Sequence, residues 1–378
     1  MIIGINATAA IKQPRTGVEE YAYRLIKHLT MLPEAGKHRF LLYLPAETRR
    51  AEAGVPFDFP LPPNFEIKIL KWPLPMWTQL RLASEMAFNK PDALFIPAHI
   101  LPAVHPGNSV VTIHGLEYEY FPQYYPFHSR KYLRWSTKYA LKHARKIIAI
   151  SDKTKNDLVK LYGADDGKIE VIYHGAKNSS LQSSLDSGKG SLRKEREEFN
   201  LPYLFYIGRV ELKKNILGIL KAYEILKEKY KIPHELVLAG EPGYGYEKIK
   251  AEIEALRLRS GCRVKESGYL SEDDKWKRLS GADVFVFPSF YEGFGIPILE
   301  AQMAGTPVVT ADNSCLPEIA GRGALYAEAT DPDQIAQVVY KSIDDKHLRD
   351  KLIQLGFENA KRFSWEKCAS ETLKVILD

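Results

Sequence analysis

A glycine-rich stretch with two acidic residues is the part of the sequence best suited to hold a charged ligand. It reads FPSFYEGFGIPILE, residues 287–300, and follows an apolar run typical of a buried strand. Gly293 and Gly295 let the backbone pass close to a ligand, and the proline that follows suits the first turn of a helix. Amides at a helix start attract a diphosphate or sugar hydroxyls, and Glu292 and Glu300 can face the same ligand. The alternative is an ordinary helix start with two solvated glutamates.

A second segment carries the positive charge that a phosphate ligand needs. It reads GRVELKKN, residues 208–215, and follows the apolar run 203–207. The guanidinium of Arg209 matches phosphate oxygens as a fork, and Lys214 supplies a mobile point charge. At the carboxyl end of a strand, the two cations can neutralise a departing diphosphate. The alternative is an ordinary basic loop.

Two further signals are weaker. His114 ends an apolar run within TIHG, and Gly17 opens a helical pattern within TGVE. A single histidine is more often structural than catalytic. The sequence has no GxGxxG, no GxxxxGK[ST], no HExxH and no GxSxG. Dinucleotide-binding, P-loop, metalloprotease and hydrolase functions are therefore disfavoured.

Short apolar runs alternate with helical patterns along the whole chain. Such alternation predicts βαβ units and mostly parallel sheets, and uniformly apolar strands indicate sheets covered on both faces. The expected strands are residues 2–6, 40–44, 66–70, 93–97, 110–114, 146–151 and 170–173, then 203–207, 235–239, 263–267, 284–288 and 307–310.

Residues 176–200 interrupt this alternation with a serine- and glycine-rich segment that ends in a charge run, as a linker does. We therefore expect an α/β protein with two Rossmann-like domains, residues 1–175 and 201–362. Ligands of open α/β sheets bind beyond the carboxyl ends of the strands, so two such domains predict a cleft for two substrates.

Composition narrows the class further. The chain has 378 residues, 45% hydrophobic and 26% charged, which is typical of a globular protein with two cores. It has no run of eighteen apolar residues and no secretory signal pattern at the N-terminus. Its three cysteines are far apart, which argues against a disulfide framework and a CxxC zinc site. We therefore expect a cytoplasmic protein.

The positive charge is concentrated in the first half of the chain. Residues 1–175 contain 23 Lys and Arg against 16 Asp and Glu, whereas the remainder contains 30 against 31. Within residues 128–146, cations recur every four positions among aromatic residues, which predicts a basic helix that contacts anionic lipid at the cytoplasmic face of a membrane. The alternative is a solvated helix face. No nucleic-acid module is present. The cations concerned are Arg130, Arg134, Lys138 and Lys142.

Together these motifs resemble the retaining glycosyltransferases of family 4, which have the GT-B fold, and the resemblance covers essentially the whole chain. Its most specific part is the Glu-x7-Glu motif formed by Glu292 and Glu300. Segments of the first half resemble the branch of bacterial mannosyl- and rhamnosyltransferases of surface-polysaccharide synthesis. The resemblance also implies that the first domain is the acceptor side, that the second domain binds the nucleotide sugar, and that the last helix, about residues 363–378, packs back on the first domain. The other matching segments are GRVELKKN at 208–215, ADVFVFPS at 282–289, AGTPVVT at 304–310, VVTIHGLEYEYFPQYYP at 110–126, KIIAISDKTKNDL at 146–158 and FSWEKCASETL at 363–373.

The resemblance implies a role for each candidate residue. Arg209 and Lys214 would hold the donor diphosphate, Glu292 the donor sugar, and Glu300 the nucleotide ribose. The loop of Gly293 would let the backbone approach the ligand, and the next three residues would offer amides to the sugar and phosphate. These three are Phe294, Gly295 and Ile296.

The resemblance implies further contacts from other segments. Gly17 would let a loop of the first domain approach the phosphates, His114 would lie near the reacting carbon, and Tyr269 would lie near the base. Two positions depart from the family pattern: Gly115 stands where many relatives have aspartate, and His174 stands where asparagine is usual.

The implied reaction is transfer of a hexose from a nucleotide-diphosphate sugar to a glycan or lipid-linked saccharide, with retention of anomeric configuration. The branch favours mannose from GDP-mannose. We expect no metal and no other cofactor, because the two cations and the helix start can compensate the leaving group. The single Asp-x-Asp, residues 331–333, is interpreted as a helix cap. The alternatives are a GT-B epimerase or phosphorylase, and a non-catalytic nucleotide-sugar binding protein.

Overall fold

The computed structural model describes residues 1–13, 15, 17–46, 57–72, 76–176, 201–260 and 262–378. The chain divides into two compact units, Met1–Gly175 together with Phe363–Asp378, and Ala176–Arg362. The expected linker lies, from residue 177 onward, outside the described residues. No helix in the described part of the chain is both long and apolar enough to span a bilayer.

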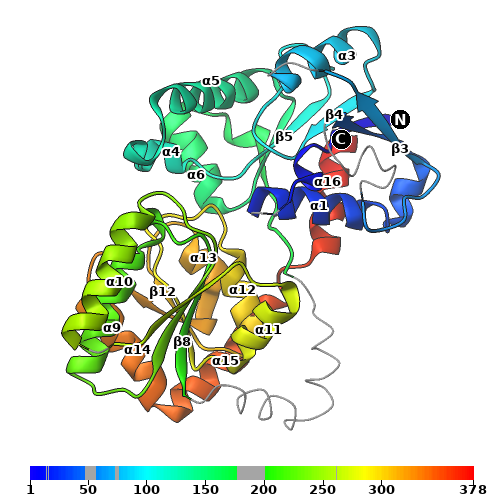
Figure 1. Ribbon diagram of the computed structural model, residues 1–378. Helices are drawn as coiled ribbons and strands as arrows, with labels where there is room; N and C mark the ends of the chain where they lie inside the picture. The colour runs from blue at the N-terminus through cyan, green and yellow to red at the C-terminus, as the bar shows by residue number, and fades with distance from the viewer. Residues whose placement is uncertain (14, 16, 47–56, 73–75, 177–200, 261) are drawn as a thin grey trace. The chain divides into compact units, whose positions relative to one another are not determined.

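The first unit is built on a seven-stranded parallel sheet with the order β3-β2-β1-β4-β5-β6-β7 (Figure 1). All seven expected strands are present, each within two residues of its expected bounds. The strands are β1 (Ile2–Asn6), β2 (Arg39–Pro45), β3 (Phe65–Leu70), β4 (Ala93–Ile96), β5 (Ser109–Ile113), β6 (Lys146–Ala149) and β7 (Ile169–Val171). The α- and π-helical segments are α1 (Gly17–Leu29), the π-helical segment η3 (Thr78–Leu82), α3 (Ala83–Phe88), α4 (Glu117–Tyr120), α5 (Phe127–His143), α6 (Asp152–Tyr162) and α16 (Trp365–Leu377). The short 3-10 turns are η1 (Ala9–Ile11), η2 (Pro33–Lys37), η4 (Pro122–Tyr124) and η5 (Asp166–Lys168).

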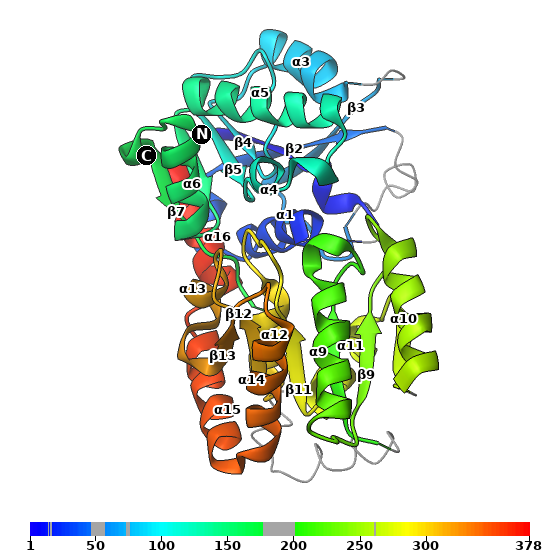
Figure 2. The same ribbon diagram turned by 90° about the vertical axis from the view of Figure 1, so that its left-hand side faces the viewer.

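Helices cover both faces of this sheet, which explains why its strands are apolar throughout. On one face, Tyr21 and Leu25 of α1 and Leu373 of α16 belong to the same buried cluster as residues of β1 and β4. On the other face, α3, α5 and α6 contribute to a second cluster. The C-terminal helix α16 contacts α1, β4 and β5, so the last residues of the chain complete the core of the first unit (Figures 1 and 2).

The second unit is built on a six-stranded parallel sheet with the order β10-β9-β8-β11-β12-β13. Helices α9, α10 and α14 lie on one side, and α11, α12 and α15 on the other (Figure 1). The strands are β8 (Tyr203–Ile207), β9 (Glu235–Ala239), β10 (Val264–Gly268), β11 (Val284–Phe287), β12 (Val308–Ala311) and β13 (Ala324–Ala327). The helices are α9 (Ile216–Glu228), α10 (Tyr246–Ser260), α11 (Glu272–Gly281), α12 (Ile296–Met303), α13 (Leu316–Ala320), α14 (Pro332–Asp344) and α15 (Lys346–Ala360), with the 3-10 turns η6 (Leu212–Lys214) and η7 (Gly321–Gly323).

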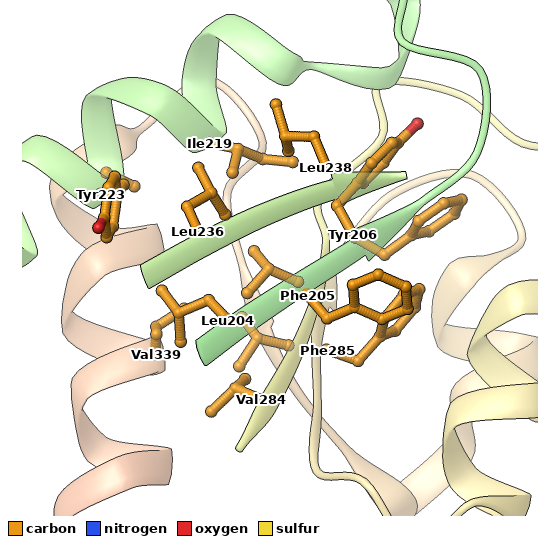
Figure 3. Close-up of a cluster of buried hydrophobic side chains, with 14 of the residues drawn as sticks. Leu204, Phe205, Tyr206, Ile219, Tyr223, Leu236, Leu238, Val284, Phe285 and Val339 are labelled. Carbon is orange, nitrogen blue, oxygen red and sulfur yellow. The ribbon is translucent and has the colours of Figure 1, made fainter. Parts of the chain in front are cut away.

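The core of the second unit fixes the strands that carry the candidate ligand loops. Leu204 and Tyr206 of β8 are buried between β9 and β11, and Ile219 and Tyr223 of α9 cover them (Figure 3). Burial of each such side chain contributes about 1.5–3 kcal/mol to stability. Strands β8 and β11 are therefore held rigidly, and so are the first residues of the loops that follow them.

Each sheet has one point at which its strand order reverses. In the first unit this point lies between β1 and β4, and in the second between β8 and β11. Loops that leave neighbouring strands at such a point diverge to opposite faces and leave a crevice beyond the carboxyl ends, where ligands of open α/β sheets bind. The topology thus indicates one candidate ligand site in each unit.

Candidate active site

In the second unit, the loops after β8 and β11 are tied together at the switch point. Asn215 follows η6 in the left-handed conformation, with φ of 60°, and its side chain is buried. Its amide nitrogen donates to the carbonyl oxygens of Pro288, at 3.0 Å, and Ala329, at 2.6 Å. These bonds hold the basic loop against the loop that carries the Glu-x7-Glu motif.

The backbone after β8 also touches the backbone after β9. Gly208 has φ of 150° and Gly240 has φ of 131°, conformations that favour glycine. A Cβ on Gly240 would lie 1.9 Å from the carbonyl oxygen of Gly208, so no larger residue fits there. This contact between backbones explains Gly240, whereas a Cβ on Gly208 would lie 2.8 Å from the hydroxyl oxygen of Tyr206.

Lys214 and Glu292 form an ion pair across the two loops. The Nζ atom of Lys214 lies 2.6 Å from Oε1 of Glu292, and the two side chains are only 15% and 11% exposed. Exposed ion pairs contribute little to stability, but breaking a mostly buried pair leaves a charge without compensation. Two residues that were selected from separate motifs thus meet at the switch point.

Residues that follow β12 hold the loop of Glu292 in place, and the sequence analysis missed them. Ser314 Oγ accepts from the Glu292 amide at 3.1 Å and donates to the Glu292 carbonyl oxygen at 2.6 Å. The thiol of Cys315 donates to the carbonyl oxygens of Glu292 and Phe294 at 3.1 and 3.2 Å. Burial, and then the charge of Glu292, raise the pKa of the Cys315 thiol, which therefore stays protonated as a donor. Their position at the carboxyl end of a strand was the only available signal.

The expected helix start after the glycine-rich loop is present at the expected place. Helix α12 begins at Ile296, and Gly295 is its N-cap residue, with φ of 95°. Because this residue has no side chain, it makes no side-chain cap to the first amides of the helix. Phe294, just before it, is buried, and Gly293 is half-buried.

Glu300 lies one turn into α12 and meets a partner that the sequence analysis missed. The Nζ atom of Lys275, in α11, lies 2.6 Å from Oε1 of Glu300 and 2.8 Å from Oε1 of Glu272. Burial lowers the pKa of Lys275, but the two carboxylates outweigh it and the pKa is raised. Lys275 is therefore charged, and a ligand hydroxyl at Glu300 would share this carboxylate with it.

Arg209 and Tyr269 lie at the same edge of the sheet but outside this group of contacts. Arg209 is exposed on the loop after β8, and the hydroxyl of Tyr206 donates to its carbonyl oxygen at 2.9 Å. Tyr269 is 58% exposed and follows β10, which β9 separates from β8. Of the two, only Arg209 leaves a strand of the switch point.

In the first unit, His114 follows β5 and is held by two bonds. Its Nε2 lies 2.6 Å from the carbonyl oxygen of Pro97, and because a carbonyl only accepts, Nε2 carries the proton. Its backbone amide donates to Nε2 of His99 at 3.3 Å. Burial, and then the neighbouring His99, lower the pKa of His114 to about 3. The ring is therefore neutral near pH 7, with Nδ1 as its acceptor atom.

A buried aromatic cluster supports His114, and the sequence analysis missed it. The ring of Tyr21 meets the His114 ring edge-on at 4.8 Å and stacks on His174 at 4.5 Å. His174 in turn stacks on Trp365 of α16, at 5.8 Å. A Cβ on Gly175 would lie 2.1 Å from the Trp365 amide nitrogen, so the backbone is pressed against α16. His174, one of the departures from the family pattern, is therefore part of the core.

Gly17 is the first residue of α1, and packing within the first unit does not require glycine there. Among the residues that the structure describes, a Cβ at this position would meet no atom within 4 Å. The contrast with Gly175 and Gly240 is clear, because a Cβ at either of those would collide with backbone. Alanine at position 17 is therefore compatible with the fold of the first unit.

The histidine cluster makes the first unit sensitive to acid. Burial lowers the pKa values from 6.5 to about 4 for His99 and about 3 for His114, and it lowers the pKa of His174 well below its usual value. As the pH falls below about 6.5, the unfolded chain takes up protons that the folded chain does not, so stability decreases by up to about 1.4 kcal/mol per pH unit for each histidine. Urea unfolding at about pH 7.5 and about pH 5, followed by tryptophan fluorescence, measures this loss.

A matched pair of variants tests the assignment of this loss. His99→Gln should reduce the pH dependence of the unfolding free energy. Glutamine takes up no proton when the chain unfolds, so one of the three contributions to this dependence is lost. The same substitution at His347, which is exposed on α15, should leave it unchanged. Equal stability of the native protein at the two pH values would contradict the neutral cluster.

Comparisons with known proteins decide the family. The model described as "Glycosyltransferase Family 4" matches residues 15–178, and the model described as "Glycosyl transferases group 1" matches residues 191–359. The chain belongs to glycosyltransferase family 4. Among the curated relatives of this glycosyltransferase is O-antigen chain mannosyltransferase B of Escherichia coli, 28% identical over 98% of each chain. Another is O-antigen chain mannosyltransferase RfbU of Salmonella typhimurium, 25% identical over 76% of this chain and 75% of the relative.

Solved structures give the fold of this family 4 glycosyltransferase. The crystal structure of Anabaena Alr3699/HepE in complex with UDP and glucose matches with a TM-score of 0.72 over 100% of this chain and 99% of that chain, at 16% identity. The GT-B architecture expected from the sequence is thereby confirmed.

Proposed function

We propose that this family 4 glycosyltransferase moves mannose from GDP-mannose to a glycan or lipid-linked saccharide, with retention of anomeric configuration. The two O-antigen mannosyltransferases named above support the choice of sugar. The observation that carries the proposal is the Lys214–Glu292 ion pair at the β8–β11 switch point, close in sequence to the uncapped start of α12. This arrangement offers positive charge for a diphosphate and a carboxylate for sugar hydroxyls at one place.

Charge compensation is the main task of the second unit in this proposal. Negative charge grows on the diphosphate as its bond to the anomeric carbon breaks. Lys214, Arg209 and the amides at the start of α12 stabilise that charge, with no metal ion required for it. Glu292 accepts from donor-sugar hydroxyls while it keeps Lys214 in place. Glu300 accepts from the ribose, and Asp331 has no part, since it accepts from the Gln334 amide as a helix cap.

The first unit contributes contacts of a different kind. His114 is neutral, so it orients the donor sugar by hydrogen bonding rather than by charge. With Nε2 bonded to Pro97, its Nδ1 is the atom available to accept from a sugar hydroxyl. Gly17, where no packing contact demands glycine, leaves room for phosphate oxygens beside the start of α1. Tyr269 is assigned to the base.

The test of this function is donor-dependent transfer. The purified protein is incubated with GDP-mannose, UDP-glucose, dTDP-rhamnose or ADP-glucose and a mannose-terminated oligosaccharide, and release of the nucleotide diphosphate is followed. Release from GDP-mannose that depends on the acceptor supports the proposal. Release without an acceptor would instead favour an epimerase, and a requirement for inorganic phosphate would favour a phosphorylase. No turnover of any donor would favour a binding protein.

We also propose that α5 contacts anionic lipid. Three exposed lysines, Lys131, Lys138 and Lys142, fall on one stripe of the helix. A row of stacked rings lies beside them, with centroids 5.7, 5.4 and 4.4 Å apart. Two of the four expected cations are less available: Arg130 is half-buried, and Arg134 bonds the Glu119 carboxylate at 2.7 and 2.9 Å. The rings of the row belong to Tyr132, Trp135, Tyr139 and His143.

Vesicle flotation tests the lipid contact. The protein is expected to float with phosphatidylglycerol vesicles at low salt and to dissociate at high salt. Each lysine near the surface contributes about 1 kcal/mol, so the double variant Lys138→Ala/Lys142→Ala should bind about thirtyfold more weakly. Lys248→Ala/Lys250→Ala, with the same charge change on exposed positions of α10, is the control. Equal flotation of the two double variants would contradict a contact through α5.

A further inference from the structure

The segment that follows β12 in the second unit has a costly backbone conformation. Ser314 has φ of 56°, in the left-handed region that serine rarely adopts. The carbonyl oxygen of Asn313, just before it, accepts from the Leu316 amide at 3.2 Å. The carbonyl oxygen of Cys315, just after it, accepts from the Ile319 amide at 3.0 Å. The conformation is thus held from both sides, and strained residues that are held in this way cluster at functional sites.

In this conformation, the side chain of Ser314 bonds the backbone of Glu292 twice. Its hydroxyl accepts from the Glu292 amide and donates to the Glu292 carbonyl oxygen, so it takes both polar groups of that backbone. The thiol of Cys315 adds a bond to the same carbonyl oxygen and another to that of Phe294. The carboxylate of Glu292 meets Lys214 at 2.6 Å. The segment after β12 therefore sets where this carboxylate lies, by holding the backbone that carries it.

Asn313, next to Ser314, carries an acceptor atom that lacks a donor. Its side-chain oxygen Oδ1 is buried and has no hydrogen-bond partner among the described residues. A buried amide oxygen without a partner is costly, and a ligand that donates a hydrogen bond removes that cost. An amide oxygen is uncharged and only accepts, so it suits a hydroxyl group and not a phosphate oxygen, which also accepts. The chemistry of this atom therefore indicates a sugar rather than a diphosphate.

We propose that Asn313 is a contact of the donor sugar, with Oδ1 accepting from a sugar hydroxyl, and that Ser314 is a positioning residue that keeps Glu292 beside it. The inference rests on the proposed function, because it extends the sugar site of that reaction. It adds the loop after β12 to the loops after β8 and β11. Neither residue brings positive charge, so the two serve recognition of the sugar and not of the nucleotide diphosphate.

Isothermal titration with GDP and with GDP-mannose tests the sugar contact, because the ratio of the two dissociation constants isolates what the sugar contributes. Asn313→Leu keeps the approximate size of the side chain and removes the acceptor atom. It should weaken GDP-mannose binding about tenfold and leave GDP binding within about threefold of native. Asp312→Ala is the control, because Asp312 is exposed one residue earlier in the same segment. Both of its dissociation constants should stay near the native values.

Two substitutions at Ser314 separate positioning from stability. Both remove the hydroxyl, but glycine adopts the left-handed conformation without strain and alanine does not. Ser314→Ala should therefore melt about 2–4 °C below Ser314→Gly. Both should weaken GDP-mannose relative to GDP by about tenfold, because each releases the backbone of Glu292. If Ser314 were only structural, the loss of binding would instead follow the melting temperature, and Ser314→Gly would bind better than Ser314→Ala.

The outcomes separate this inference from the proposed function. An unchanged ratio in Asn313→Leu, equal affinity of the native protein for GDP and GDP-mannose, or equal losses of both ligands in the variants would overturn the sugar contact while GDP binding persists. Binding of UDP and UDP-glucose in place of the guanine nucleotides would count against the proposed donor, and the same ratio measured with that pair would then decide the contact. No binding of any of the four ligands by the native protein would overturn both.

Discussion

Replacing Lys214 by alanine should reduce transfer by two to three orders of magnitude. In the proposed function the ammonium group faces the growing charge of the leaving diphosphate, and removal of one such group typically lowers kcat about 10²–10³-fold. The loss should appear in single-turnover transfer at saturating donor. Arg209→Ala should cause a similar loss without a change in stability, because Arg209 is exposed.

The adjacent lysine provides a matched control. Lys213 lies in the same turn, η6, and its Nζ is 3.4 Å from Oε1 of Glu211. Lys213→Ala therefore removes the same charge and also breaks an ion pair, but a different one. It should retain transfer within a few-fold of the native rate. Lys214→Ala leaves Glu292 mostly buried and unpaired, so its fold must be checked by thermal unfolding. Near-native transfer by Lys214→Ala, or equal losses in the two lysine variants, would contradict the assignment.

Replacing Glu292 by glutamine should have two opposite effects. Transfer should fall about a hundredfold, because the carboxylate that we propose accepts from the donor sugar becomes a neutral amide. GDP should bind more tightly, because the negative charge 2.6 Å from Lys214 no longer opposes the diphosphate. Isothermal titration with GDP and a transfer assay with GDP-mannose measure the two effects.

Because transfer should weaken while GDP binding should tighten, a general loss of structure cannot produce the expected result. A misfolded site would lose both GDP binding and transfer. Glu211→Gln changes a buried carboxylate on the neighbouring loop, after β8, and is the control, with both quantities expected to stay near native values. Weaker GDP binding by Glu292→Gln, or unchanged transfer, would argue against a carboxylate that serves the donor sugar and balances Lys214.

Much of the fold could be predicted because local pattern and burial agree. Strands β1, β8 and β9 have the expected bounds, since each is a short apolar run covered on both faces. β13 was missed because its sequence, ALYA, is short and alanine-rich at the edge of a sheet. The expectation that the C-terminal helix packs on the first unit came from the family resemblance and not from hydrophobic periodicity.

Residues of the candidate site could be selected from the sequence where they belong to a local motif. Residues that join the site only through contacts between distant segments could not. Lys214 and Glu292 were found from two segments, each next to its own strand. Lys275 was missed because α11 meets α12 only through the fold, and nothing in its segment signals Glu300 as a partner. The support of His114 by Tyr21 and Trp365 was missed for the same reason, because these residues are joined only by tertiary packing.

The anomeric configuration of the product provides the sharpest test of the proposed transfer reaction. GDP-α-mannose and a mannose-terminated oligosaccharide are incubated with the native protein and with Lys214→Ala, and the new glycosidic bond is followed by NMR from the earliest turnover. We expect the native protein to form an α-linked mannose together with GDP, and the variant to form almost none. A β-linked product, free mannose without a new bond, or equal product from both proteins would contradict it.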